Sequence, residues 1–349
     1  MKILILISSL EGGGAERIAS RVASALADKH EVHIMPFSSA SSPYPISDKV
    51  KVDNAGLFDL RKKSRLPFRF LISIVFGYFF LSFIRLRFRP DVTLSFLKKP
   101  SLLNAFALGG GRKIMSERNN PRQKGERHFR MTCLAYRHAD KVIFQSNTVR
   151  NMFPEEIRRK GVVIPNPVEV VCEASGNSHK IVASGRLRPQ KNFALLIKAF
   201  SAFLASHPDH TLHIYGKGPL EGALRRQISD MSLEGKVFLE GYVDRIHEAI
   251  QDAEMFVLSS YFEGMPNALL EAMMMGLPCV TTAFEGAGEL FGDSDSCLMV
   301  PVGDERAMAE AMAKLDDEPQ FRDSLSNRGR MFAERFSTEK VIPLWEKEL

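Results

Sequence analysis

Apolar runs of strand length alternate with helical patterns along both halves of this 349-residue chain. In the first half, residues 2–8 predict a strand, residues 15–28 a helix and residues 31–36 a second strand. Further strands are predicted at residues 92–96, 113–116 and 141–145. The second half repeats the plan, with strands at residues 180–184, 211–215, 237–239, 255–258 and 278–282 and helices at residues 193–205, 220–231, 246–252 and 267–275. This alternation predicts an α/β fold in which helices flank parallel sheets.

The length of the chain suits two domains. Residues 165–178 are rich in Pro, Glu, Ser and Gly, a composition that is typical of a linker. We therefore expect an N-terminal domain over residues 1–168 and a C-terminal domain over residues 169–330. Residues 331–349 predict a terminal helical segment.

The composition is that of an ordinary soluble globular protein, with 45% hydrophobic and 25% charged residues. The four cysteines (Cys133, Cys172, Cys279 and Cys297) show neither metal-ligand spacing nor a paired pattern, which favours a reduced, cytoplasmic compartment. The first residues enter a strand pattern directly and lack a small-residue cleavage site, so we expect no signal peptide.

Charge is distributed unevenly along the chain. The net charge is +6, but residues 1–170 contain 29 Lys and Arg against 14 Asp and Glu, whereas the remaining residues contain 18 against 27. The basic half should prefer an anionic surface, either nucleic acid or an anionic bilayer. Because no nucleic-acid-binding module of known spacing is present, we expect no nucleic-acid partner.

Residues 61–89, from Arg61 to Arg89, join an apolar run to clustered basic residues. The run covers residues 70–84, which is shorter than the roughly 20 residues that span a bilayer. The basic residues that flank it are Arg61, Lys62, Lys63, Arg65 and Arg69 on one side and Arg85, Arg87 and Arg89 on the other. One interpretation is a buried helix with solvated ends. The other is a helix that lies in the headgroup region of an anionic membrane, which would place the protein peripherally on the inner face of the cytoplasmic membrane.

The segment 262–271 combines a predicted helix start with two flanking carboxylates. It follows the apolar run 255–258, and Pro266 suits the first turn of a helix because that turn needs no donated N–H. Amides at such a helix start form a positive site for an anion such as a diphosphate. The residues expected to form it are Gly264, Met265, Pro266, Asn267, Ala268 and Leu269. Glu263 precedes this site. Glu271 lies five residues after Pro266, which is roughly 7 Å along the helix axis and within reach of a ribose diol. The alternative is an ordinary junction whose acidic residues offset the helix dipole.

Arg186 and Lys191 place two cations near another predicted helix start in the same half. Alone they would be ordinary surface charges, but with the segment 262–271 they are better explained by a shared diphosphate. Two cations and amides neutralise a leaving nucleoside diphosphate without a metal. Because no Asp-x-Asp suited to bridging a divalent ion is present, we expect a metal-independent enzyme with no cofactor.

Three consecutive glycines, Gly12, Gly13 and Gly14, follow the first predicted strand. They do not form a nicotinamide-dinucleotide fingerprint, because Arg17 occupies the position of the third glycine. Glycines here would instead let the backbone approach a bound diphosphate or acceptor closely.

Glu263 and Glu271, with Gly-Met-Pro-Asn and Leu-Leu-Glu-Ala around them, resemble the signature of retaining glycosyltransferases of family 4. The similarity extends over nearly the whole chain. It includes the glycine loop with Glu16, the sequence Ser-Glu-Arg-Asn from residue 116, Ile-Pro-Asn-Pro-Val from residue 164, Ser-Gly-Arg-Leu from residue 184, Lys191 with Asn192, and the segments around Gly216 and Val243.

This resemblance implies two Rossmann-like domains that face each other across a cleft, the GT-B architecture, with the terminal helix packed back on the N-terminal domain. It implies that Glu263 binds the donor sugar, Glu271 the ribose, and Arg186 and Lys191 the diphosphate. Gly216 and Val243 would belong to the nucleoside pocket, Gly13 and Gly14 would approach the donor, and Glu16, Glu117 and Arg118 would lie on the acceptor side.

The implied reaction moves a hexose or N-acetylhexosamine from a UDP-sugar to a lipid-diphosphate-linked saccharide in bacterial surface polysaccharide assembly. Two alternatives stay open: an enzyme like UDP-N-acetylglucosamine 2-epimerase, and a non-catalytic partner that binds sugar nucleotides. The sequence identifies no protein base.

Overall fold

The computed structural model describes residues 1–11, 13–38, 42, 44–53, 69–122, 125–170, 172–176 and 178–349. The chain forms two compact units, which we describe separately. Unit 1 comprises Met1–Pro167 together with Thr338–Leu349, and unit 2 comprises Val168–Ser337.

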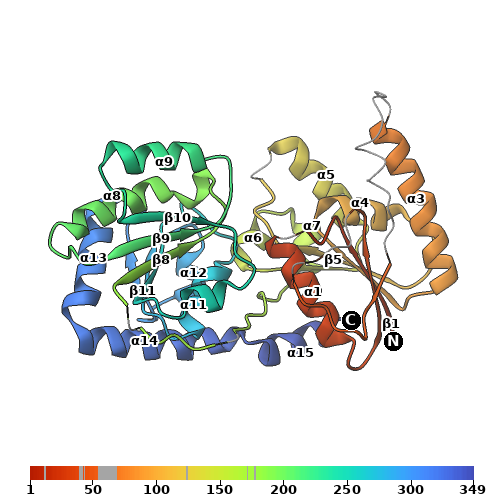
Figure 1. Ribbon diagram of the computed structural model, residues 1–349. Coiled ribbons are helices and arrows are strands. Elements are labelled where there is room, and N and C mark those ends of the chain that lie inside the picture. The colour runs from red at the N-terminus through yellow and green to blue at the C-terminus, as the bar shows by residue number, and fades with distance from the viewer. Residues whose placement is uncertain are drawn as a thin grey trace. The chain divides into compact units, whose positions relative to one another are not determined.

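Unit 1 contains a seven-stranded, wholly parallel sheet in the order β3-β2-β1-β4-β5-β6-β7 (Figure 1). Its strands are β1 (Lys2–Ile7), β2 (Glu31–Pro36), β3 (Lys51–Val52), β4 (Val92–Phe96), β5 (Arg112–Glu117), β6 (Lys141–Phe144) and β7 (Gly161–Val163). Its helices are α1 (Gly14–Leu26), α3 (Arg69–Phe88), α4 (Lys98–Phe106), α5 (Glu126–Arg137), α6 (Asn147–Asn151), α7 (Glu155–Arg158) and α15 (Thr338–Glu348).

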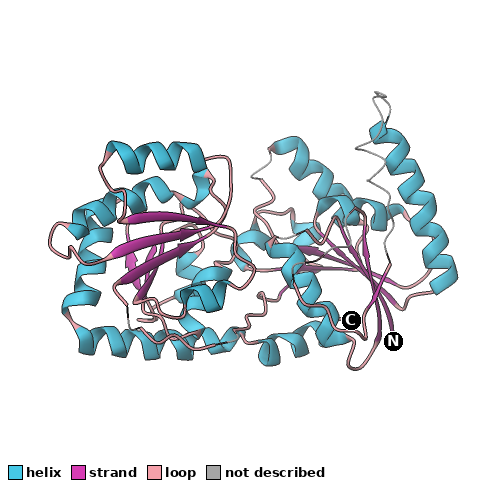
Figure 2. Ribbon diagram, viewed as in Figure 1, coloured by secondary structure: helices cyan, strands magenta, loops and turns pink. Residues whose placement is uncertain are grey.

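The alternation of side chains along β1 explains why helices cover both faces of this sheet (Figure 2). Ile3 and Ile5 point to one face and pack in the cluster that contains residues of α1 and α15. Leu4 and Leu6 point to the other face, where they pack with residues of α3 and α4. Because both faces are covered, the strand is apolar at every position from Ile3 to Ile7.

Unit 2 contains a six-stranded parallel sheet in the order β10-β9-β8-β11-β12-β13. Its strands are β8 (Lys180–Ser184), β9 (Thr211–Tyr215), β10 (Val237–Gly241), β11 (Met255–Leu258), β12 (Cys279–Thr282) and β13 (Leu298–Val300). Its α-helices are α8 (Phe193–Leu204), α9 (Glu221–Asp230), α10 (Ile246–Ile250), α11 (Asn267–Met274), α12 (Ala287–Phe291), α13 (Glu305–Asp317) and α14 (Pro319–Ala333), and its 3₁₀ turns are η1 (Pro189–Lys191) and η2 (Glu334–Phe336).

The two sheets share one topology. In each, the chain adds three strands in one direction and then returns to the starting strand to add the others, which is the Rossmann order. The predicted α/β fold with two Rossmann-like domains is therefore confirmed. The order creates a switch point between β1 and β4 in unit 1 and between β8 and β11 in unit 2, and ligands of such sheets bind at the carboxyl ends of the strands there.

The chain passes between the units at two neighbouring places. Val168 forms a parallel bridge with Ser337 in unit 2, so residues 331–337 belong to this unit and the helix α15 alone returns to unit 1. There the fully buried Trp345 stacks on Phe96 of β4 with ring centroids 5.9 Å apart.

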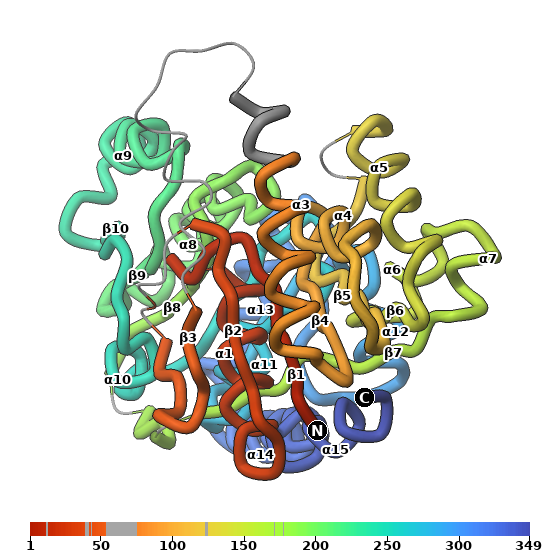
Figure 3. The backbone as a smooth tube through the Cα atoms, turned by 90° about the vertical axis from the view of Figure 1, so that its right-hand side faces the viewer, coloured from red at the N-terminus to blue at the C-terminus, as the bar shows by residue number. Residues whose placement is uncertain are grey.

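The helix α3 lies beside α4, as Figure 3 shows for unit 1. Among the described residues, no helix is long and apolar enough to cross a membrane. The basic residues from Arg61 to Arg65 lie outside the described part of the chain.

The expectation that Arg85 contributes an exposed charge is wrong. Its side chain is buried, and its guanidinium donates to the carbonyl oxygens of Ala107 (3.2 Å) and Gly110 (2.7 Å). Arg85 therefore holds the segment that follows α4, and burial lowers its pKa. Arg87 and Arg89, by contrast, are exposed.

Candidate active site

Two loops meet at the switch point of unit 2. Residues 185–191 follow β8 and residues 259–266 follow β11, and these two strands pair directly in parallel. Both loops therefore leave the carboxyl edge of the sheet side by side. This edge is where the structure places most of the donor-side residues expected from the sequence.

Hydrogen bonds join the two loops. Ser259 Oγ donates to the carbonyl oxygen of Lys191 (2.7 Å), and the Tyr261 amide donates to that of Gln190 (2.9 Å). The Gln190 side-chain amide donates in turn to the carbonyl oxygen of Phe262 (2.8 Å). These bonds fix the turn η1, which carries Lys191, against the segment that carries Glu263.

Lys191 and Glu263 form an ion pair across the loops. The distance from Lys191 Nζ to Glu263 Oε1 is 2.7 Å, and the side chains are 16% and 8% exposed. Ser260 Oγ also donates to Glu263 Oε1 (2.6 Å). The carboxylate is therefore held in one orientation by two donors. The ammonium group of Lys191 has three N–H donors, so it can keep Glu263 and still bind an anion.

Two glycines make this arrangement possible. A Cβ at Gly185 would lie 2.7 Å from Lys191 Cε, so a larger residue here would displace the lysine side chain from its path across the loop. A Cβ at Gly216 would lie 1.9 Å from the carbonyl oxygen of Gly185, and Gly216 has φ +144°. Gly216 therefore supports the donor-side loop from the neighbouring strand, β9. Arg186 lies in the same loop and is exposed.

The amino end of α11 differs in one respect from the anion site expected over Gly264–Leu269. The helix begins at Asn267, and Pro266 occupies the cap position before it. The Asn267 amide donates to the carbonyl oxygen of Met265 (3.0 Å), so it closes a tight turn and does not point to an anion site. The amides of Ala268 and Leu269 follow in the first turn, where a helix supplies no acceptors of its own.

Glu271 lies in the second turn of α11 and is buried. Its Oε2 atom lies 3.4 Å from Nε2 of His247, a buried residue of α10. The helix α10 follows the segment that contains Val243, which packs in the same apolar cluster as α11. Sequence reasoning missed His247, because no spacing in the chain connects it to Glu271.

An Asp-x-Asp does occur at Asp293 and Asp295, but both residues are exposed between α12 and β13. They therefore precede a strand and lie at the amino edge of the sheet, whereas the loops described above leave the carboxyl edge.

The remaining predicted residues belong to unit 1. Gly13 caps α1, where its carbonyl oxygen accepts from the Arg17 amide (3.0 Å), and Gly14 and Glu16 lie in the first turn of this helix. Gly12 lies outside the described residues. These positions follow β1 and thus lie at the switch point of the first sheet.

Glu117 and Arg118, expected on the acceptor side, are both buried. The carboxylate of Glu117 accepts from the amides of Arg118 and Asn119 (both 3.1 Å) and from the Tyr136 hydroxyl (3.1 Å). Despite these bonds, burial raises the pKa of Glu117 to about 7.

The guanidinium of Arg118 also takes its partners from unit 1. It donates to Ser116 Oγ (2.8 Å) and to the carbonyl oxygen of Ile164 (2.8 Å), and it lies 4.6 Å from the ring centre of Trp345. Burial lowers its pKa to about 9. These contacts fix the end of β5 and the position of α15. The acceptor-side role expected for Glu117 and Arg118 stays a prediction.

Two family models match the chain. The model described as Glycosyltransferase Family 4 matches residues 12–171, and the model described as Glycosyl transferases group 1 matches residues 178–317. The chain belongs to glycosyltransferase family 4. The resemblance inferred from the motifs is thereby confirmed, and so is the prediction that this protein is an enzyme, a glycosyltransferase.

Two relatives from Campylobacter jejuni match this glycosyltransferase over its full length. One is named N-acetylgalactosamine-N,N'-diacetylbacillosaminyl-diphospho-undecaprenol 4-alpha-N-acetylgalactosaminyltransferase; it is 27% identical, with 97% of each chain covered. The other is named GalNAc-alpha-(1->4)-GalNAc-alpha-(1->3)-diNAcBac-PP-undecaprenol alpha-1,4-N-acetyl-D-galactosaminyltransferase; it is 26% identical, with 99% of this chain and 98% of the relative covered.

Solved structures of similar fold include HepE from Anabaena in complex with UDP and glucose. It has a TM-score of 0.82 at 18% identity and covers 100% of this chain and 99% of its own. TarM from S. aureus, solved with UDP among its ligands, has a TM-score of 0.81 at 14% identity, with 99% of each chain covered. At these identities the likeness establishes the GT-B fold of the glycosyltransferase.

The raised pKa of Glu117 gives a test of the buried position described above. An ordinary Glu has a pKa near 4.3, so between pH 4.3 and 7 the folded chain binds a proton that the unfolded chain releases. The free energy of unfolding should therefore fall as pH rises through this window, by up to about 4 kcal/mol. We expect the urea midpoint of the wild type to decrease from pH 5 to pH 7.5 relative to Glu117→Gln. The variant Glu126→Gln, which removes an exposed carboxylate of unit 1, should show the same decrease of the urea midpoint with pH as the wild type. An equal change of the urea midpoint with pH in the wild type and Glu117→Gln would show that Glu117 is ionised over the whole range from pH 5 to pH 7.5.

Proposed function

We propose that this glycosyltransferase is retaining and metal-independent and that it moves a hexose or N-acetylhexosamine from a UDP-sugar to a lipid-diphosphate-linked saccharide. The observation that carries the proposal is the Lys191–Glu263 pair at the switch point of unit 2. It puts a cation for the diphosphate and a fixed carboxylate for the sugar within 2.7 Å of each other, as the junction between these two parts of a nucleotide sugar requires.

Lys191, Arg186 and the first-turn amides of α11 would stabilise the leaving nucleoside diphosphate. Negative charge grows on the phosphate oxygen as its bond to the anomeric carbon breaks, and cations and amides that are already in place stabilise this charge without reorganisation. No divalent ion is needed for this role. We therefore propose that the enzyme uses neither a metal nor another cofactor in the transfer.

Retention requires the acceptor hydroxyl to attack from the face that the diphosphate leaves. In that geometry the bond from the anomeric carbon to the phosphate oxygen breaks, a bond to the acceptor oxygen forms, and the acceptor proton passes to the released phosphate oxygen. The donor itself then supplies the base. Glu263 would bind hydroxyls of the sugar, and Glu271, placed by α11 and His247, would bind the ribose.

The proposed acceptor class is supported by the two full-length relatives, whose names specify a diphospho-undecaprenol or PP-undecaprenol carrier. These names describe transferases, which favours a transferase over the alternatives of an epimerase or a non-catalytic binding partner. Polysaccharide assembly on such a carrier takes place at a membrane. The exposed apolar side of α3 supports this location.

The exposed side of α3 is apolar. The residues Val75, Phe76, Phe79, Phe83 and Leu86 are exposed, and the last four follow one another at the three- and four-residue intervals that place side chains on one stripe of a helix. Phe79 and Phe83 are 64% and 60% exposed. The opposite side is buried through Leu81 and Arg85. We propose that this stripe enters an anionic membrane surface at the cytoplasmic face, with the exposed Arg87 and Arg89 beside the headgroups.

The donor prediction is tested by turnover of a panel of nucleotide sugars. We expect slow hydrolysis of one or more UDP-sugars, and we expect this hydrolysis to persist in EDTA because Lys191 and the amides carry the role of a metal. Arg306→Gln, a charge change on the exposed face of α13, serves as the control for Arg186→Gln, which should lower turnover by at least about tenfold. Loss of turnover in EDTA that Mg²⁺ or Mn²⁺ restores would contradict the metal-free mechanism.

The membrane prediction is tested by sedimentation with vesicles that contain phosphatidylglycerol. The double variant Phe79→Ser/Phe83→Ser should bind at least about tenfold more weakly, since it removes much of the apolar area that the headgroup region would bury. Met331→Ser, which removes an equally exposed apolar side chain from α14 of unit 2, should bind like the wild type. High salt should weaken wild-type binding without abolishing it, because salt screens only the basic residues. If the wild type ignores these vesicles at low salt, the stripe has another role.

A further inference from the structure

A cluster of histidines and carboxylates lies at the amino edge of the sheet of unit 2. His210, His179 and Glu254 each stand directly before a strand, namely β9, β8 and β11. These three strands are neighbours in the sheet, so their first residues come together although they lie far apart in sequence. Backbone hydrogen bonds hold the starts of these strands side by side. The Thr211 amide donates to the carbonyl oxygen of His179, and the Glu254 amide donates to that of Lys180 (both 2.9 Å).

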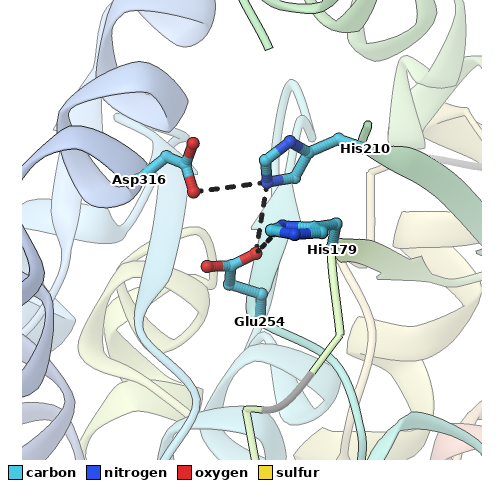
Figure 4. A group of neighbouring side chains, drawn as sticks. All are labelled: His179, His210, Glu254 and Asp316. Carbon is cyan, nitrogen blue, oxygen red and sulfur yellow. Dashed lines mark hydrogen bonds and ion pairs between the residues drawn. The ribbon is translucent and has the colours of Figure 1, made fainter. Parts of the chain in front are cut away.

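Asp316 completes the cluster from the last turn of α13 (Figure 4). His210 Nε2 lies 3.1 Å from Glu254 Oε2 and 3.3 Å from Asp316 Oδ1. His179 Nδ1 lies 3.6 Å from the same Glu254 oxygen. The four donor atoms all lie within 4.8 Å of one another.

These distances match the spacing of ligands around a tetrahedral zinc ion. Nitrogen and oxygen ligands bind Zn²⁺ at about 2.0–2.2 Å, so two of them at the tetrahedral angle are about 3.3 Å apart. The separations of 3.1, 3.3 and 3.6 Å bracket this value, and two imidazole nitrogens with two carboxylate oxygens form a donor set that suits zinc. The longest separations, at most 4.8 Å, must close by up to about 1.5 Å to reach the tetrahedral spacing, and the side chain of His179, which is 63% exposed, has room to move.

The surroundings orient the ligands and leave negative charge to be neutralised. Arg322 pairs with the other oxygen of Glu254, Oε1, which turns Oε2 toward the histidines. His207 lies 3.5 Å from the second oxygen of Asp316 and 3.2 Å from Asp317. The carboxylates of Glu254, Asp316 and Asp317 therefore outnumber the one arginine, Arg322, that these contacts bring to the cluster.

We propose that His179, His210, Glu254 and Asp316 bind one Zn²⁺ ion as a structural site. The strand β8 is five residues long, so the cluster lies roughly 16 Å from the loop that carries Lys191, at the opposite edge of the sheet. The ion therefore takes no part in sugar transfer. It ties the starts of β8, β9 and β11 to α13 and stabilises the unit that binds the donor.

The test is calorimetric titration of the purified, chelator-stripped protein with ZnCl₂, paired with thermal unfolding. We expect one ion per chain and an unfolding temperature that rises with zinc, because binding to the folded state stabilises it. His179→Ala removes an exposed ligand and should fold normally, yet bind zinc at least about tenfold more weakly and lose most of the thermal shift. His210→Gln and Asp316→Asn should also lose binding.

His213→Ala is the matched control. His213 pairs with the carboxylate of Glu240 in the same unit (2.6 Å) and belongs to no metal-binding group found among the residues that the structure describes, so this variant should bind zinc like the wild type. The proposal is overturned if the wild type binds no zinc, or if His179→Ala binds it as tightly as the wild type does, as it would if the thiols were the ligands. Turnover of the UDP-sugar at 25 °C should be equal with and without zinc, which keeps this test separate from that of the catalytic mechanism.

Discussion

The ion pair between Lys191 and Glu263 joins two loops whose residues lie 72 positions apart in the chain. It exists because β11 returns to pair with β8, so that both strands deliver their following loops to one edge of the sheet. The same adjacency aligns the turn η1 with the segment before α11 and allows the three hydrogen bonds between them. Each donor-side role that we propose for unit 2 depends on this strand order.

The pair is better understood as a positioning device than as a source of stability. Taking a lysine and a glutamate out of water costs about as much as their attraction returns, so a largely buried ion pair contributes little net stability. Its effect is on geometry: the carboxylate is fixed by Lys191 and Ser260, and the lysine keeps further donors for an anion. Gly185 and Gly216 also help to position Lys191. A larger residue at Gly185 would displace the lysine side chain, and one at Gly216 would displace the backbone of the loop at Gly185.

The buried charges of unit 1 have a different role. Arg118 bonds β5 to the carbonyl oxygen of Ile164 and lies over the ring of Trp345, which belongs to the returning helix α15. Glu117 is tied to Tyr136 of α5. Besides the acceptor-side role that the resemblance implies, Glu117 and Arg118 thus connect β5, α5 and the C-terminal helix α15 within unit 1.

The strand periodicity and the helix patterns predicted the α/β class and the two Rossmann-like domains, because buried parallel strands leave continuous apolar runs. The short strands β3, β7 and β13 have two or three residues each and leave no such pattern. Local chemistry also predicted that Lys191 and the segment 262–271 contribute to one site. It could not show that Arg85 is buried, since its carbonyl partners lie more than 20 residues away.

Contacts that depend on the order of the strands also could not be predicted from the sequence. His247 meets Glu271 only because α10 and α11 pack in one cluster. The ligands of the proposed zinc site are separated by 31, 44 and 62 residues and match no short metal-binding spacing.

The most direct measurement of the central assignment is calorimetric titration with UDP of the wild type and the variants Lys191→Met, Glu271→Gln and Glu263→Gln. If Lys191 binds the diphosphate and Glu271 the ribose, the first two variants should bind UDP at least about tenfold more weakly. Glu263→Gln should bind UDP within about threefold of the wild type yet lose sugar transfer, because its partner is the sugar that UDP lacks. Equal losses of UDP affinity in Glu263→Gln and Glu271→Gln would contradict this division of the site.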